Sequence, residues 1–351
     1  MESLHKKIEE LLQEVLEIEA SKTEHFSFVL EGKLKIPEEE ALKYIKEKVK
    51  LLDFFVSFRR KGEGISLTFI PLPEKKERKD WINFLLLIMT FITTLIAGAL
   101  QLEVNPFSPI FNIIKGIPFS LSIMLIIGSH ELGHYLLARK NNVDASLPYF
   151  IPAPHLIGTF GAIIKMRSPI KDRNSLIEIG AGGPIIGFIV STIVLLIGLH
   201  LSEPVSISDY KGGLTLGDSI LIKLFTRIYF HTLPEGKDIS LHPIAFAGWI
   251  GYFITALNLL PVGQLDGGHI LYALINEKSK IVGWIVFGIA ILLSFFWIGW
   301  IVWAILFLVI GFKHPSPLDT ISPLSKKHKI IALISFLILI LTFVPTPFLV
   351  K

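Results

Sequence analysis

The chain has 351 residues, of which 51% are hydrophobic, and its formal net charge at pH 7 is only +4. This composition is too apolar for a soluble globular protein, and the small charge does not indicate a nucleic-acid partner, so we expect a protein embedded in the lipid bilayer that binds no nucleic acid. The absence of cysteine excludes disulfides, thiolate metal sites and cysteine nucleophiles, so any metal must be bound by histidine and carboxylate.

Residues 1–80 predict a small soluble α+β domain. Apolar periodicity predicts helices over 2–18 and 37–50, and alternating apolar residues predict strands in HFSFVLEG, LDFFVSF and ISLTFIP. The segment PEKKERKDW that follows is basic, as expected on the cytoplasmic side of a first membrane span; its charges are Lys75, Lys76, Arg78 and Lys79.

Residues 81–351 predict an α-helical polytopic membrane domain with about seven spans. About 20 apolar residues suffice to cross the hydrocarbon core. Such stretches occur near 82–101, 117–138, 176–199, 243–262 and 330–346. The run 281–312 is too long for one comfortable span, and we interpret it as a short hairpin that turns near 296–299.

The distribution of lysine and arginine predicts how this domain is oriented. The loops 139–175, 263–280 and 313–329 are rich in basic residues, whereas 102–116 carries Lys115 alone and 200–242 carries both signs of charge. By the positive-inside rule the basic loops and the N-terminal domain are cytoplasmic, provided that 281–312 is a hairpin. We therefore expect a multi-pass protein of the cell membrane.

The stretch IIGSHELGHYLLARK places the pattern H-E-x-x-H inside an apolar segment. His130 and His134 are four residues apart, so on a helix they share one face and both imidazoles can bind one metal ion. Glu131 is then positioned to act as general acid and base on a metal-bound water. The alternative, a helix end capped by polar residues, is disfavoured because ionisable groups inside a span are costly.

A catalytic zinc site takes three protein ligands and a water, so a third ligand is required. The stretch ALNLLPVGQLDGGH supplies Asp266, which Pro261 and the neighbouring glycines place in a turn at the end of a span. With the orientation above, Asp266 and His134 lie at the same depth. An ordinary turn role for Asp266 stays open, and His269 is a further candidate ligand or hydrogen-bond partner.

HELGH on one span and NLLPVGQLDGG at the end of a later span resemble the site-2 protease family of intramembrane zinc metalloproteases. The segments GTFGAIIKM (a strand), GAGGPIIG (a turn), LHPIAFAGW and HPSPLDTISPL are similar to its archaeal, cyanobacterial and plastid branch, which is related to the plant EGY proteases. The resemblance implies one Zn²⁺ per chain, bound by His130, His134 and Asp266, with Glu131 as catalytic acid/base and Asn258 near the substrate or oxyanion. It also implies hydrolysis of peptide bonds within or next to transmembrane segments of protein substrates.

The segment LIGTFGAIIKM, residues 156–166, predicts a membrane-associated β segment because it is rich in β-branched residues and flanked by prolines. Its edge could pair with an unwound substrate, so Gly161, Ala162 and Ile163 are candidate substrate-binding residues. A re-entrant hairpin that only plugs the cavity is the alternative.

Other features have simpler interpretations. The glycines of GAGGPIIG let a span approach its neighbours closely, or expose backbone to the substrate. The segment 217–230 mixes charged and apolar residues and could lie in the outer interface, as a linker helix or a gate. His155 and His242 lie at loop or span edges and are interpreted as solvated.

Two other functions compete with proteolysis. A membrane zinc-binding or transport protein would need polar groups at several depths, and it would leave Glu131 without a role. A catalytically silent relative would not need the complete set of His130, Glu131, His134 and Asp266.

Overall fold

The computed structural model describes residues 2–24, 27–49, 54–71, 80–206, 214–231, 233–234 and 236–350. The chain divides into two compact units: unit 1 comprises Met1–Arg78, Ser168–Leu176 and Pro315–Ser325, and unit 2 comprises Lys79–Arg167, Ile177–His314 and Lys326–Lys351. The basic charges expected before the first span, residues 75–79, lie outside the described residues.

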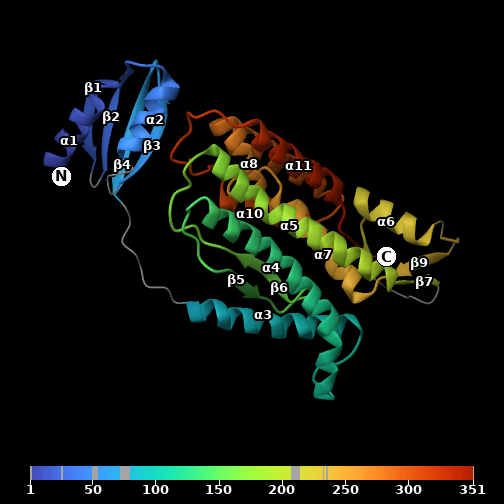
Figure 1. Cartoon of the computed structure of the whole chain (residues 1–351). Helices are drawn as coiled ribbons and strands as arrows, with labels where there is room; N and C mark the ends of the chain where they lie inside the picture. Colours follow the sequence, from blue (N-terminus) through green and yellow to red (C-terminus); the bar gives the residue numbers. More distant parts are fainter. Residues whose placement is uncertain are drawn as a thin grey trace. The chain divides into compact units, whose positions relative to one another are not determined.

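Unit 1 is built on a four-stranded antiparallel sheet with the strand order β1-β2-β4-β3 (Figure 1). Its elements are α1 (Glu2–Leu12), β1 (Leu16–Glu24), β2 (Ser27–Leu34), α2 (Glu38–Val49), β3 (Phe54–Lys61) and β4 (Gly64–Pro71). Alternate strand residues such as Phe28 and Leu30 are buried in one core with residues of both helices. The expected helix over 2–18 is wrong in its second half, because Leu16 to Glu24 pair with β2 instead.

Two segments distant in sequence extend this sheet beyond β3. The backbone N–H of Phe58 donates to the carbonyl of Leu318 (2.6 Å), and Thr320 donates back to Phe58 (3.3 Å). Leu318 and Asp319 in turn donate to Ile170 and Lys171 (2.9 and 2.8 Å). Unit 1 is therefore assembled from three separate stretches of the chain.

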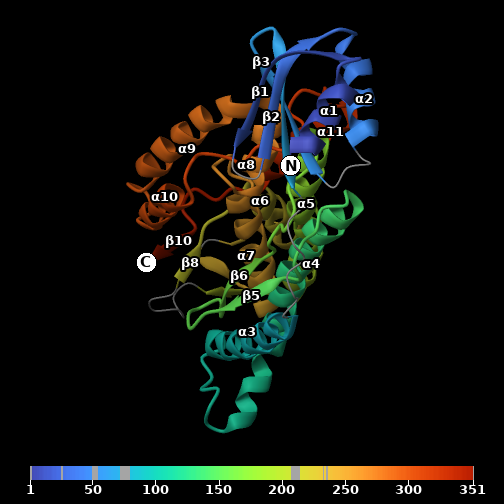
Figure 2. The ribbon, with the colours of Figure 1, turned by 90° about the vertical axis from the view of Figure 1, so that its left-hand side faces the viewer.

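Unit 2 is predominantly helical. Its helices are α3 (Asp80–Gln101), η1 (Ile110–Gly116), α4 (Ile117–Lys140), α5 (Arg173–His200), α6 (Ile220–Phe230), α7 (Pro243–Asn258), α8 (Asp266–Ile275), η3 (Asn276–Lys278), α9 (Ser279–Leu293), α10 (Gly299–Ile310) and α11 (Lys326–Thr342). Within the described residues, three helical segments are long and apolar enough to cross a membrane: Asp80–Gln101, Phe111–Lys140 and Arg173–His200. The run 281–312 splits into α9 and α10, as expected (Figure 2). A total of about seven spans stays a prediction.

Helices α4, α5 and α7 pack closely because glycines face their neighbours. A Cβ at Gly133 of α4 would lie 2.6 Å from the carbonyl oxygen of Gly182 on α5, and a Cβ at Gly248 of α7 would lie 2.6 Å from the backbone of Leu195 on α5. The expected close approach at GAGGPIIG is thus confirmed. The expected turn there is wrong, because these residues lie inside α5 with Pro184; packed neighbours allow proline within such a helix.

Three short antiparallel pairs complete unit 2: β5 (Tyr149–Pro152) with β6 (Thr159–Ile163), β7 (Glu203–Ser206) with β9 (Lys237–Ser240), and β8 (Leu214–Leu216) with β10 (Phe348–Val350). Strand β6 confirms the strand expected in the segment after α4, and it contacts both α3 and α4.

Candidate metal centre

The two histidines of the H-E-x-x-H motif lie one turn apart on α4, and both are buried, His130 at 5% and His134 at 6% exposed. Glu131 is also buried, in the same turn. A helix buries three polar side chains in this way only when they have partners, because unpaired charged groups are costly to desolvate.

The third candidate ligand, the carboxylate of Asp266, comes from a tight loop between α7 and α8. Helix α7 ends at Asn258, and Asp266 is the first residue of α8. Gly263 has a φ of +50°, which favours glycine, and a Cβ at Gly267 would collide with the carbonyl oxygen of Leu259. These glycines let the chain fold back tightly enough to direct Asp266 toward α4.

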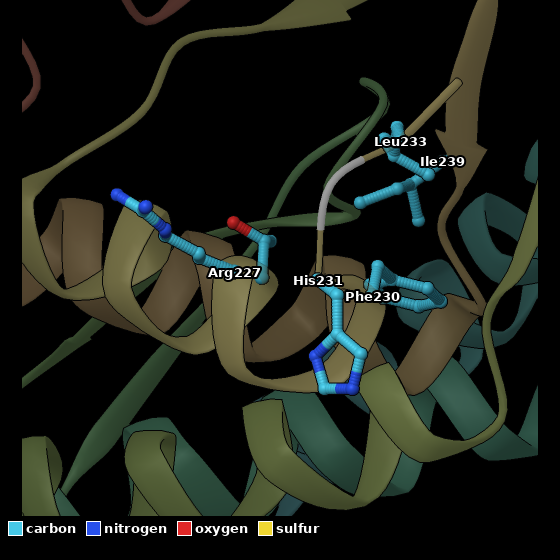
Figure 3. A pocket seen from close by; sticks show the side chains of 6 residues that line it. Arg227, Phe230, His231, Leu233 and Ile239 are labelled. Atoms are coloured by element: carbon cyan, nitrogen blue, oxygen red, sulfur yellow. The ribbon is translucent and has the colours of Figure 1, made fainter.

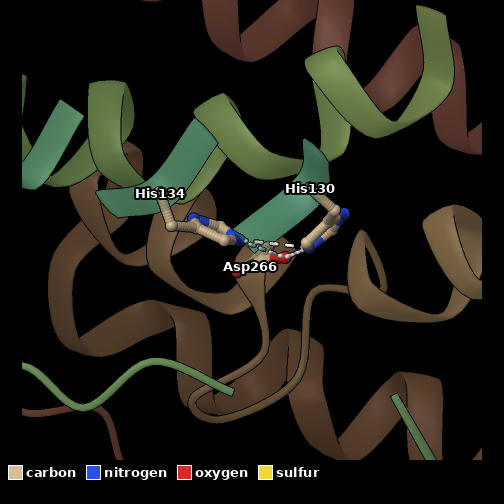
Figure 4. Close-up of side chains that lie close together, drawn as sticks. All are labelled: His130, His134 and Asp266. Atoms are coloured by element: carbon tan, nitrogen blue, oxygen red, sulfur yellow. Dashed lines mark hydrogen bonds and ion pairs between the residues drawn. The ribbon is translucent and has the colours of Figure 1, made fainter. Parts of the chain in front are cut away.

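The side chains of His130, His134 and Asp266 converge (Figure 4). The Oδ2 atom of Asp266 lies 3.3 Å from the Nε2 atoms of both histidines, and the two Nε2 atoms are 3.1 Å apart. For zinc–ligand bonds of about 2.0–2.1 Å in a tetrahedron, ligand atoms lie roughly 3.3 Å from one another. The donor atoms and their spacing therefore fit a single zinc ion.

Helix α5 contacts the rings of both histidines and orients His134 through a hydrogen bond. His134 Nδ1 lies 2.7 Å from the carbonyl oxygen of Ile179, so Nδ1 carries the proton and Nε2 is free to bind a metal. A Cβ at Gly183 would collide with the His134 ring, and one at Gly187 would lie 3.0 Å from His130 Nδ1. The sequence predicted close helix packing at these glycines but not that they make room for the two imidazoles.

Asn258 and the segment around β6 border the cluster. Asn258 Nδ2 lies 3.5 Å from His130 Nε2. The backbone of Ile164, directly after β6, hydrogen-bonds the carboxylate of Glu131. The predicted substrate-binding residues Gly161, Ala162 and Ile163 are in β6 itself and outside the three-residue cluster.

The other histidines singled out in the sequence form hydrogen bonds outside the candidate metal centre. His242 is the N-cap of α7 and accepts a hydrogen bond from Ile244, and His155 accepts one from Ile157. His269 lies outside the cluster of His130, His134 and Asp266, and its Nδ1 is 2.5 Å from His314 Nε2.

A separate pocket of about 300 Å³ lies at the end of α6 (Figure 3). It is lined by Thr226, Arg227, Phe230, His231, Leu233 and Ile239. It shares no residue with the histidine–aspartate cluster, so it is not the metal centre.

Two histidines and a carboxylate with an adjacent glutamate form the ligand arrangement of a metallopeptidase centre. Residues 118–296, just over half of the chain, match the family model described as Peptidase family M50. The chain therefore belongs to peptidase family M50, as the motif resemblance implies.

Several of the relatives that it matches are plant proteins. It is 36% identical over 174 residues to "Probable zinc metalloprotease EGY1, chloroplastic" of Arabidopsis thaliana, which covers 47% of this chain and 31% of that protein. It is 33% identical over 165 residues to the corresponding EGY2 protein of Arabidopsis thaliana, covering 47% and 30%. This chain thus spans about a third of the length of these relatives. No significant match to a solved structure was found.

Proposed function

We propose that the protein is an intramembrane zinc metalloendopeptidase that hydrolyses peptide bonds within or next to transmembrane segments of other proteins. The observation that carries this proposal is the convergence of three metal-ligand atoms, two from α4 and one from α8, next to the buried Glu131 of α4. Family membership supports the same activity.

In this proposal His130, His134 and Asp266 bind one zinc ion, and the carbonyl of Ile179 keeps His134 in the required tautomer. A bound zinc ion would supply Lewis acidity and lower the pKa of water from about 15.7 to about 7. Glu131 takes the proton of the attacking water and then donates it to the leaving amine. Asn258 donates a hydrogen bond to the substrate carbonyl or the developing oxyanion.

The substrate helix must unwind before its backbone can be attacked, because an intact transmembrane helix satisfies all its own hydrogen bonds. We propose that β6 accepts the unwound stretch by strand addition, through Gly161, Ala162 and Ile163. The contact between Ile164 and Glu131 supports this, because a strand added to β6 would lie beside the catalytic glutamate. Gly161 N–H already donates to Thr159 Oγ1 (3.0 Å), so main-chain pairing would depend more on the residues after it.

We further propose the following placement in the cell. Residues 1–80 form a cytoplasmic domain, and residues 81–351 form the polytopic metalloprotease domain with about seven spans, in the cell membrane and with the metal centre toward the cytoplasm. The basic loops support this orientation. The relatives named above are described as chloroplastic.

Zinc transport, the alternative function, is supported less well than proteolysis. A transporter would pass the ion between sites at different depths, whereas the described residues contain a single group of three metal-binding side chains. Glu131, which is not in that group, is explained by proteolysis and not by transport.

The purified chain, reconstituted in lipid, tests the proposal with a panel of single-span substrates. We expect products that disappear with a zinc chelator and return when zinc is added back. Glu131→Gln is the matched control, because it removes the acid/base and leaves the metal ligands in place. Cleavage that persists in the chelator or in Glu131→Gln would refute the proposed mechanism.

A further inference from the structure

His269 and His314 form a partly buried contact that the proposed reaction does not use. His269 Nδ1 lies 2.5 Å from His314 Nε2, and the rings are perpendicular with centroids 4.7 Å apart. One of these nitrogen atoms must therefore donate a proton and the other accept it. His314 is 5% exposed and lies in the segment that follows α10, so the contact joins parts of the chain 45 residues apart.

This contact lies one turn along α8 from Asp266. Asp266 begins the helix and His269 closes its first turn through the bond from its backbone N–H to the carbonyl of Leu265 (2.9 Å). The first hydrogen-bonded turn of a helix fixes the backbone dihedrals of its residues together, so the orientations of His269 and Asp266, which share this turn, are linked. Holding His269 therefore holds the carboxylate that completes the metal centre.

Aromatic packing fixes the His314 side of the contact. The ring of Tyr272, the next residue on the same face of α8, stacks on His314 with centroids 4.5 Å apart and an interplanar angle of 20°. The Tyr272 hydroxyl donates to Glu277 (3.0 Å), and Tyr272 is 2% exposed. Two residues of α8 therefore hold His314 in place: His269 through a hydrogen bond and Tyr272 through ring stacking.

The backbone around this contact leaves little room for another arrangement. A Cβ at Gly263, in the loop before Asp266, would collide with the carbonyl oxygen of Gly311, three residues before His314. On the opposite side, a Cβ at Gly180 of α5 would lie 2.9 Å from His269 Cβ and 3.3 Å from the carbonyl oxygen of Asp266. The start of α8 is therefore enclosed between α5 and the segment 311–314.

We propose that His269 and His314 are positioning residues for the third metal ligand: their hydrogen bond ties the first turn of α8 to the segment after α10 and holds the Asp266 carboxylate toward His130 and His134. This inference rests on the proposed zinc site. It gives a role to His314, which lies beyond the residues matched by the family model.

The test measures the zinc dissociation constant of the full chain in detergent by competition with a chromophoric chelator. We expect His269→Ala and His314→Ala each to weaken zinc binding about tenfold. This is the lower end of the loss in metal affinity that follows when a residue that orients a metal ligand is removed. The double variant should also lose about tenfold, because the two changes break one bond. His314→Gln keeps a polar group near the position of Nε2 and should bind zinc within about threefold of wild type.

Two further measurements separate positioning from general packing. The visible spectrum of the Co²⁺-substituted protein should shift in both alanine variants and return toward wild type in His314→Gln, because it reports the ligand geometry. His200→Ala, at the exposed end of α5, is the matched control and should leave both zinc affinity and spectrum unchanged.

Three results would overturn the inference: zinc affinity within twofold of wild type in both alanine variants, additive losses in the double variant, or losses that follow the melting temperature of the zinc-free protein without rescue by His314→Gln. A wild-type chain that binds no zinc would instead contradict the proposed metal centre itself, and the inference with it.

Discussion

The carbonyl oxygen of Ile179 on α5 lies 2.7 Å from Nδ1 of His134 on α4. Because a carbonyl can only accept, this contact sets the protonated nitrogen and turns Nε2 toward Asp266. Three helices thus form the candidate metal centre: α4 carries two of the candidate ligands, the start of α8 carries the third, and the Ile179 carbonyl of α5 orients His134.

The first prediction concerns metal content. We expect one zinc ion per chain in wild type, loss of zinc in Asp266→Ala, and retention of zinc without proteolysis in Glu131→Gln. The reason is that Asp266 is one of the three side chains whose potential ligand atoms converge, whereas Glu131 is not in that group. Elemental analysis of the purified proteins measures this. Equal zinc in wild type and Asp266→Ala would rule out the ligand assignment.

A second prediction uses the glycines behind the centre. Gly183→Ala should reduce zinc affinity by roughly tenfold or more, because the added Cβ would collide with the His134 ring and displace Nε2. Gly288→Ala in α9 is the matched control, since a Cβ there meets nothing within 4 Å. Zinc competition measured on both variants should separate them; equal affinities would mean that α5 can move aside at no cost.

The third prediction tests strand addition at β6. Successive residues of a strand direct their N–H groups to opposite edges, so Ala162 shares the edge on which Ile164 contacts Glu131. Ala162→Pro removes that N–H and should lower the cleavage rate while zinc stays bound. Ala162→Val keeps the N–H and serves as control. Normal cleavage by Ala162→Pro would contradict pairing at this position.

The fourth prediction concerns unit 1 and pH. Burial alone would raise the pKa of Asp319, but hydrogen bonds from Lys46 (2.5 Å) and Ser322 outweigh it and hold the pKa below its usual 3.8. A depressed folded-state pKa means that this stabilisation is complete above about pH 4 and is lost as the pH falls through the folded-state value.

At pH 7, Lys46→Met should therefore destabilise the packing of the segment 315–325 by about 1–3 kcal/mol, because it leaves a buried carboxylate without its cation. Hydrogen exchange at the Thr320 amide, which donates to Phe58, measures this. Lys43→Met, the same change at an exposed position of the same helix, is the control. Identical exchange in the two variants would show that the ion pair contributes nothing.

The fifth prediction concerns membrane orientation. The chain has no cysteine, so Lys171→Cys and Lys237→Cys introduce single labels at exposed positions. An impermeant thiol reagent should reach them from opposite faces of a sealed vesicle, because the loops that contain them differ in basic charge. Labelling from the same face would disprove the proposed arrangement.

The sequence allowed the motif chemistry to be predicted because helical spacing alone brings His130 and His134 together. It also indicated Asp266, since Pro261 and its glycines predict a turn at matching depth. It did not reveal that Gly183 makes space for His134 or that His314 contacts His269, because both depend on tertiary packing between residues that no local pattern connects. Strand β1 was missed for a related reason: pairing with β2 outweighed a helical periodicity carried over from α1.

The assembly of unit 1 from three stretches has a practical consequence for work with fragments. A protein ending near residue 80 would contain the four strands but lack the segment that bonds to Phe58. Its β3 edge would present free N–H and carbonyl groups, which invite pairing with other molecules and aggregation. Expression of this region in soluble form should therefore improve when a peptide spanning 315–325 is fused to it or supplied with it.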